Sequence, residues 1–339
     1  KRVKEAAERK ADYLAANPAA EQDALPEGNK AKEPSNIQRR WIVNTLSGKF
    51  FQQHQPIKKQ TKPAGHAVRY AYLQTAGTMI DKLTEGSDFL DSLEKSWQHM
   101  VAKQMYITGG IGSLPVIEGF GRDYELDPGF AYAETCAALG SLFWNREMVK
   151  LTGKACYSDL YEWQIYNAVL VGMGLDGTTY FYNNPLMSDG KVQRQNWYEV
   201  PCCPSNLSRT FAALQNDIIT IQKDRSIDIQ QYISSQHIVE IGSETFTFEI
   251  TSGLPWEGET GITIKQAPRN EVKLNLRLPS WAGKREISIN GEKLHNELNS
   301  GPFLLNPNNA KWVSVERQWT VGDQVNLNFD MPVRTYHPH

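Results

Sequence analysis

The chain has 339 residues, of which 36 are basic and 38 acidic, so its formal net charge at pH 7 is −2. This near balance gives no reason to expect binding to nucleic acid or to a membrane surface, and we predict neither partner. No apolar run approaches the roughly 20 residues of a transmembrane helix. The N-terminal sequence has no signal-peptide pattern, so we expect a cytoplasmic protein; export stays open because we expect an N-terminal segment to be absent.

The first two thirds of the chain have the pattern of helices separated by turns that carry proline or glycine. The helical segments are residues 2–16, 36–53, 65–83, 87–103, 136–151, 155–173 and 204–222. After Asp224 the pattern changes to short runs in which apolar and polar residues alternate. Such alternation between turn residues predicts an antiparallel β-sandwich. We therefore predict two domains, a helical one over residues 1–223 and a sandwich over residues 224–339.

Two short segments supply an unusual set of metal-binding side chains. Glu134 and Cys136 lie two residues apart, and Cys202 and Cys203 are adjacent. Zinc in proteins takes thiolate and carboxylate ligands, and a thiolate-rich set favours zinc over magnesium. Each pair stands where an apolar helical pattern begins, so we expect both pairs at helix N-termini. The alternative is ordinary buried cysteines, but a buried Glu134 would then have no positive partner.

A glycine-rich stretch, residues 106–113, precedes a loop that carries several carboxylates. The glycines superficially resemble a phosphate-binding loop, but no strand pattern precedes them and no helical pattern follows directly. We favour a tightly turning active-site loop in which at least one carboxylate is a proton donor, although exposed loop carboxylates are usually only solvated. The carboxylates are Glu118, Asp123, Glu125 and Asp127.

Several stretches of the sequence, taken together, carry a resemblance to a known family. They are YITGGIGS, EGFGRDYELDP, AYAETCAALG, DGTTYFYNNPL and CCPSN. They resemble glycoside hydrolase family 127, the β-L-arabinofuranosidases, from roughly His66 to Arg209. The resemblance implies an (α/α)6 barrel followed by β-sandwich domains. Such a barrel has twelve helices and the sequence shows seven helical segments, so we expect an α+β multidomain chain whose barrel is incomplete.

The resemblance also implies particular roles at the candidate site. It implies Zn²⁺ held by Glu134, Cys136, Cys202 and Cys203, with Cys202 as nucleophile and Glu118 as general acid/base. Retaining glycosidases normally attack with a carboxylate. Here a thiolate would take that place, kept deprotonated near neutral pH by zinc. The implied function is a retaining hydrolase that releases β-L-arabinofuranose from an arabinofuranoside-containing oligosaccharide or glycan.

Three further residues are implied as substrate contacts: His66, Glu162 and Tyr182. Each has a plainer interpretation, as a helix-start histidine, a solvated helix residue and an aromatic core residue. Without the resemblance we would favour the plainer interpretation for all three.

Other classes of function stay open at this point. One is a non-catalytic carbohydrate-binding protein, or an inactive fragment, in which zinc is purely structural. Another is an isomerase or epimerase on the same helical fold, but that chemistry usually needs a pair of histidines, and the spacing of the histidines singles out no pair. A homodimer is a further open hypothesis.

Overall fold

The structure is a computed structural model that describes residues 34–84, 86–298, 309–333 and 335. These residues form two compact units, which we describe separately. The first unit contains the described residues up to Glu147 together with Trp163–Arg209, and the second contains Met148–Glu162 with the described residues from Thr210 onward. The units therefore interleave along the chain. The division into linear domains near Asp224 stays a prediction.

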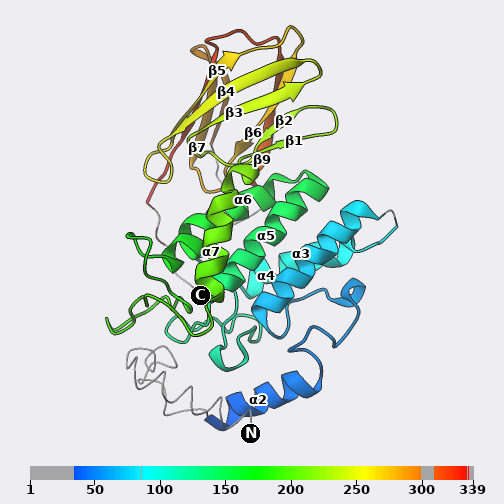
Figure 1. Ribbon diagram of the computed structural model, residues 1–339, viewed down its shortest axis with the longest axis vertical. Helices are drawn as coiled ribbons and strands as arrows, with labels where there is room; N and C mark the ends of the chain where they lie inside the picture. Colours follow the sequence, from blue (N-terminus) through cyan, green and yellow to red (C-terminus); the bar gives the residue numbers. More distant parts are fainter. Residues whose placement is uncertain (1–33, 85, 299–308, 334, 336–339) are drawn as a thin grey trace. The chain divides into compact units, whose positions relative to one another are not determined.

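Helices dominate the chain up to Asp217 (Figure 1). The short helical turns are 3-10 helices at Ile57–Lys59, Pro115–Ile117, Leu170–Gly172 and Leu214–Asp217 and a π-helix at Ile165–Val169. The described α-helices are α2 (Pro34–Leu46), α3 (Ala67–Leu83), α4 (Leu90–Lys103), α5 (Thr135–Thr152), α6 (Ala155–Gln164) and α7 (Cys202–Ala213).

The predicted helices are confirmed in three cases, shortened in three and untested in one. The predicted helix 36–53 ends earlier than expected, since α2 stops at Leu46. The segment 2–16 lies outside the described residues. The predicted helix 155–173 is shorter than expected, because α6 passes into the π-helix after Gln164. The predicted helix 204–222 is wrong at its end, where Ile219–Ile221 form strand β1 and pair with strand β2 (Ile227–Ile229). The β-branched Ile-Thr-Ile sequence favours a strand, and a partner strand is close by.

The first unit is held together by buried aromatic side chains that also hydrogen-bond. Tyr70 packs edge-on against Trp144 with ring centroids 5.7 Å apart. Trp97 donates its indole N–H to Asn145 across 2.7 Å. Helix α4 presents Leu93, Trp97 and Met100 to this core at helical spacing, because residues four and three apart share one face.

The second unit contains two β-sheets (Figure 1). The four-stranded sheet has the order β1-β2-β6-β9, with β6 at Val272–Leu278 and β9 at Lys311–Arg317. The six-stranded sheet has the order β3-β4-β5-β10-β7-β8. Its strands are β3 (Ser235–Ile241), β4 (Glu244–Ser252), β5 (Glu259–Gln266), β10 (Gln324–Phe329), β7 (Lys284–Ile289) and β8 (Glu292–Leu298).

The two sheets share one apolar core. Ile229 and Leu276 from the first sheet belong to the same buried cluster as Phe248, Ile264 and Val325 from the second. The predicted sandwich is therefore present, and every pair in the six-stranded sheet is antiparallel. The four-stranded sheet corrects the prediction, because β2 and β6 pair in parallel. Strands β3, β4 and β5 lie between them in sequence and provide the long crossover that a parallel pair needs.

No helix in the described part of the chain is both long and apolar enough to cross a membrane.

Candidate active site and metal centre

Four predicted metal ligands come together in the first unit. Glu134 directly precedes α5 and Cys136 lies in its first turn, while Cys202 and Cys203 begin α7. The predicted position of both pairs at helix N-termini is thus confirmed. One ligand atom from each residue lies within 4.8 Å of those of the other three. We call this set the Glu/Cys cluster.

The spacing inside the Glu/Cys cluster suits a four-coordinate cation. Cys136 Sγ lies 3.4 Å from Cys203 Sγ, and Cys202 Sγ lies 3.9 Å from Cys203 Sγ. Glu134 Oε1 lies 3.4 Å from Cys202 Sγ and 3.5 Å from Cys203 Sγ. Zinc ligands at the usual distances of about 2.3 Å for sulfur and about 2.1 Å for oxygen stand about 3.5 to 3.8 Å apart at the corners of a tetrahedron. The donor set therefore fits a metal ion of this kind.

Two residues beside the cluster hold its ligands in place. The Tyr132 hydroxyl donates a hydrogen bond to Glu134 Oε2, and the Asn206 side-chain amide donates one to Cys136 Sγ across 2.9 Å. Such partners orient metal ligands and tune their basicity. We did not predict roles for either residue. Both residues lie in the same short motifs as the ligands. Asn206 follows Cys202 by four residues, about one helical turn, and this spacing could have indicated that Asn206 lies beside the cluster.

The electrostatics of the cluster distinguish Cys202 from the other thiols. Hydrogen bonds from the Cys136 and Cys203 thiols lower the pKa of Cys202 to about 2. Burial raises the pKa of the Cys203 thiol, and it raises the pKa of Glu134 to about 8. Cys202 is also half-buried, whereas the other three ligands are buried. The thiolate of the cluster is therefore carried by its most accessible member.

Glu118 contacts His66 and Tyr182, two of the three predicted substrate contacts. His66 Nε2 is 3.1 Å from Glu118 Oε2, and the Tyr182 hydroxyl donates to Glu118 Oε1 across 3.4 Å. A hydrogen bond from Tyr182 also contributes to the lowered pKa of Cys202. Tyr182 thus contacts both Glu118 and the cluster. His66 is in addition the N-cap of α3, where its Nδ1 accepts from Val68 N across 3.2 Å, as the plainer interpretation expected.

The backbone around Glu118 is held in an uncommon conformation. Glu118 has a φ of 47°, a left-handed value that few non-glycine residues adopt. Its carbonyl accepts from Ala67 N across 2.9 Å, which ties the loop to the start of α3. A Cβ at Gly119 would stand 2.0 Å from the Gly65 carbonyl oxygen. Glycine is therefore required at position 119 for this close approach, which places Glu118 beside His66.

The glycine-rich stretch packs against the segment that precedes Glu134. Ala133 N donates to the Gly112 carbonyl across 2.8 Å. A Cβ at Gly112 would stand 2.8 Å from the Tyr132 ring, and the residue has a φ of 89°. The stretch thus packs against the segment that carries Glu134. This close packing gives the glycines a structural reason that needs no phosphate.

The other carboxylates of the loop are committed to structural contacts. Asp123 pairs with His99 at 2.8 Å, and Glu125 accepts two hydrogen bonds of 2.7 Å from Arg40. Asp127 accepts from the backbone of the turn that follows it. Of the four predicted candidates, Glu118 is therefore the one that adjoins Tyr182 and the cluster.

Glu162 lies in the second unit and has its own partners there. Arg277 donates to its Oε2, and the Trp281 indole N–H donates to its Oε1 across 2.6 Å. Arg277 also donates to Asp159 across 2.8 Å. Glu162 is buried, which contradicts the interpretation as a solvated helix residue. Its role as a substrate contact stays a prediction.

Two family models together match most of the chain. The model of the GH127 β-L-arabinofuranosidase catalytic domain matches residues 27–216, and the model of the GH127 middle domain matches residues 226–331. The chain belongs to glycoside hydrolase family 127. The Glu/Cys cluster and Glu118 both lie within the part that matches the catalytic domain.

Relatives of known structure or curated function support this family membership. A non-reducing end β-L-arabinofuranosidase of Bifidobacterium longum is 31% identical over 271 residues, which are 76% of this chain and 41% of that protein. Ara127N, a GH127 β-L-arabinofuranosidase from Geobacillus stearothermophilus T6, superposes with a TM-score of 0.78 and 30% identity, over 91% of this chain and 50% of that one. A second structure, of a GH127 β-arabinofuranosidase, superposes with a TM-score of 0.75 and 27% identity, over 92% of this chain and 54% of that one. The chain thus spans about half the length of these relatives.

Proposed function

We propose that this family 127 chain is a retaining β-L-arabinofuranosidase in which Cys202 is the nucleophile and Glu118 the general acid/base. One observation carries the proposal: the accessible thiolate of the cluster, Cys202, shares Tyr182 as a neighbour with Glu118. Hydrolysis with retention requires a nucleophile and a proton donor that flank the same glycosidic bond at short separation, and the shared neighbour supports this assignment. The other three cluster residues are buried and suit the holding of a metal ion.

The metal that fits the cluster is zinc, held by Glu134, Cys136, Cys202 and Cys203. When bound, Zn²⁺ would stabilise the Cys202 sulfur as a thiolate near neutral pH and improve it as a leaving group.

In the first step, Cys202 Sγ attacks the anomeric carbon while the bond from that carbon to the departing oxygen breaks. Glu118 gives its proton to the departing oxygen, and His66 and Tyr182 hold the Glu118 carboxyl group in position. In the second step, Glu118 takes a proton from water, whose oxygen attacks the anomeric carbon and releases the thiolate. Two inversions at one carbon leave its configuration unchanged.

The substrate that we propose is a glycan that ends in β-L-arabinofuranose. The Bifidobacterium relative is named for action at the non-reducing end of such chains. We propose His66, Tyr182 and Glu162 as the sugar contacts; the position of the first two beside Glu118 supports their assignment. We also propose that the described helices belong to an (α/α)6 barrel, the fold that the resemblance implies.

The decisive experiment traps the sugar on the protein. In Glu118→Gln, an aryl β-L-arabinofuranoside still transfers its sugar, because an aryl leaving group needs little protonation. Release of the sugar by water should slow by about 10²- to 10⁴-fold, the usual contribution of a general base. Mass spectrometry after brief exposure to substrate should therefore find one sugar on Cys202.

Asp123→Asn is the matched control, since it neutralises another carboxylate of the same loop and should accumulate no adduct. Cys202→Ser should form none either. A sugar attached to Glu118 or to another carboxylate, or an inverted product without any adduct, would refute the thiolate nucleophile and leave the metal a structural role.

A further inference from the structure

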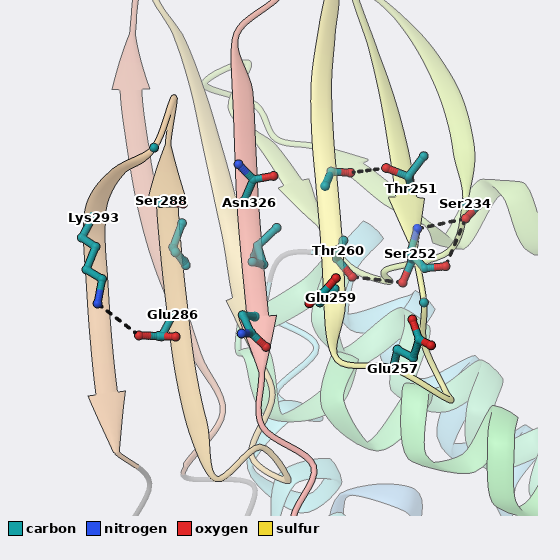
Figure 2. Close-up of a pocket in the computed structure, with 16 residues that line it drawn as sticks. Ser234, Thr251, Ser252, Glu257, Glu259, Thr260, Glu286, Ser288, Lys293 and Asn326 are labelled. Carbon is teal, nitrogen blue, oxygen red and sulfur yellow. Dashed lines mark hydrogen bonds and ion pairs between the residues drawn. The ribbon is translucent and has the colours of Figure 1, made fainter.

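The six-stranded sheet of the second unit carries a polar groove on its solvent side (Figure 2). The groove has a volume of about 780 Å³, within the range of roughly 300 to 1,000 Å³ that is typical of ligand pockets. Its lining comes from strands β4, β5, β10, β7 and β8 and from the turns that join them. No step of the proposed hydrolysis uses these residues.

Strand register explains how the groove is built. Thr251 of β4 is opposite Gly261 of β5, and Gly261 is opposite Asn326 of β10. Asn326 is opposite Ser288 of β7, and Ser288 is opposite Lys293 of β8. Residues opposite one another in a sheet share a face, so these five form one row across five strands. At about 4.8 Å between strands, the row is about 19 Å long.

A second row runs beside the first on the same face. Glu259 is opposite Asn328, and Asn328 is opposite Glu286. These residues stand two positions along their strands from the first row, which places their side chains on the same side of the sheet. The intervening residues Ile287 and Leu327 are buried in the sandwich core. The groove floor is thus rigid, because the strands that carry it are fixed by the core beneath.

Glycine makes the centre of the first row hollow. Gly261 lies between Thr251 and Asn326 and contributes no side chain. A Cβ at this position would stand 3.2 Å from Thr251 Oγ1 and 3.9 Å from Asn326 Oδ1. A larger side chain at position 261 would therefore occupy the space between these two polar groups.

Several polar groups of the groove are available to a ligand. Within the described part of the chain, the side chains of Ser288, Asn326 and Asn328 make no hydrogen bond with another residue. They offer a hydroxyl group and two amides, which both donate and accept. They come from two adjacent strands in the middle of the groove. A ligand that donates and accepts along its length would satisfy them.

The charge and polarity of the lining restrict the class of ligand. Glu257, Glu259 and Glu286 contribute three carboxylates, and Lys293 contributes one ammonium group, which lies 3.4 Å from Glu286. An anionic ligand such as a nucleic acid would be repelled by this excess of negative charge. The apolar lining residues are buried beneath the floor, so an apolar peptide would find little to contact. A neutral ligand rich in hydroxyl groups fits best.

An exposed tryptophan stands next to the groove in sequence. Trp256 is 87% exposed and lies in the turn between Gly253 and Glu257, both of which line the groove. A single exposed aromatic side chain is common on protein surfaces, so the position of Trp256 beside the groove is what makes it relevant. The C–H faces of a sugar ring pack favourably on an aromatic ring, which suits Trp256 to the same ligand class.

We propose that this groove is a second saccharide-binding site, which takes a neutral oligosaccharide segment of a glycan. The hydroxyl groups of the sugar bond to Ser288, Asn326 and Asn328, and Gly261 leaves the depth that a sugar ring needs. Such a site would hold a polymeric substrate on the protein independently of the chemistry at Cys202.

The test is affinity electrophoresis of the full chain in native gels that contain soluble arabinan, arabinogalactan or xylan, with polygalacturonate as the acidic comparison. At least one neutral polysaccharide should retard the wild-type protein more than polygalacturonate does. Asn326→Ala removes an amide that can make about one hydrogen bond and should weaken this binding by about 5- to 10-fold. Gly261→Leu fills the floor without removing a polar group and should weaken it at least as much.

Gln324→Ala is the matched control, because Gln324 is exposed on the same strand and face as Asn326 but does not line the groove. It should bind as the wild type does, and circular dichroism should show that all variants are folded. The proposal is overturned if no neutral polysaccharide retards the protein, or if Asn326→Ala and Gly261→Leu both bind like the wild type. Equal loss in Gln324→Ala, or stronger binding of polygalacturonate, would overturn it too. Failure of the proposed function would leave these results unchanged, since they measure binding alone.

Discussion

The hydroxyl group of Tyr182 donates a hydrogen bond to Oε1 of Glu118 across 3.4 Å, and the same hydroxyl group helps to stabilise the thiolate of Cys202. One phenol thus touches the proposed proton donor and the proposed nucleophile. Burial raises the pKa of Tyr182 well above its ordinary value, so the hydroxyl group keeps its proton and remains a donor. We infer that Tyr182 fixes the positions of both groups as well as contacting the sugar.

Tyr182→Phe should therefore lower kcat/KM toward an aryl β-L-arabinofuranoside by about 10- to 100-fold, as expected for a lost hydrogen bond to a charged group. Metal content should stay unchanged, because Tyr182 is not a ligand. Tyr180→Phe is the matched control, since the Tyr180 hydroxyl group bonds to the Gly177 carbonyl. Equal rates in wild type and Tyr182→Phe would contradict this role.

We expect the purified protein to carry about one equivalent of zinc. Cys203→Ser should lose most of it, because a buried thiolate ligand is replaced by a hydroxyl group. Cys156→Ala should keep its zinc, since Cys156 lies in α6 and is not part of the Glu/Cys cluster. Elemental analysis of reduced, folded protein after removal of adventitious metal measures all three. Zinc loss in Cys156→Ala alone would show that the wrong thiols are assigned.

Local sequence was sufficient to predict the Glu/Cys cluster because its residues sit in short motifs, whereas the roles of Glu118, His66 and Tyr182 came from the family resemblance. The adjacent thiols of Cys202 and Cys203 start a helix, and Glu134 precedes another, so helical patterning placed both pairs correctly. Contacts between segments that are distant in the sequence could not be predicted from local patterns. Glu162 receives Arg277 from 115 residues away, and no local pattern indicates which cation approaches a helical carboxylate. The parallel pairing of β2 with β6 likewise depends on the path of three intervening strands.

Sequence patterns also mark the ends of elements poorly. The segment that ends in Ile219–Ile221 continues a helical apolar pattern, but its β-branched residues and the pairing with β2 make this end a strand. Pairing with a neighbouring strand thus overrides the helical pattern at this end of the segment.

Arg277 should be the residue on which the second unit depends most. It is fully buried and donates to Asp159, Glu162 and the Gln230 carbonyl. Arg277→Met would leave two buried carboxylates without their cation, which typically costs about 3 to 5 kcal/mol. Urea unfolding should show this loss. Lys265→Met breaks an exposed pair with Glu249 and should cost no more than about 1 kcal/mol. Similar losses in the two variants would refute the assignment.

The pair formed by Arg40 and Glu125 should make stability depend on pH in the acidic range. The two hydrogen bonds from Arg40 hold the pKa of Glu125 below its ordinary value of 4.5. In the folded protein Glu125 therefore binds a proton less readily than in the unfolded chain. Its contribution is fully present above about pH 4.5 and is lost as the pH falls through the lowered folded pKa. Stability should thus rise with pH in this window.

The measurement compares the free energy of unfolding of wild type and Glu125→Gln between pH 3 and pH 7. The wild type should be the more stable protein at pH 7, and its advantage should shrink as Glu125 takes up its proton. In an Arg40→Met background the pH dependence of this difference should become smaller, because the largest cause of the lowered pKa of Glu125 is gone while the hydrogen bond from Arg122 N remains. An advantage of wild type that grows on acidification, or that persists unchanged in the Arg40→Met background, would show that Arg40 does not control this carboxylate.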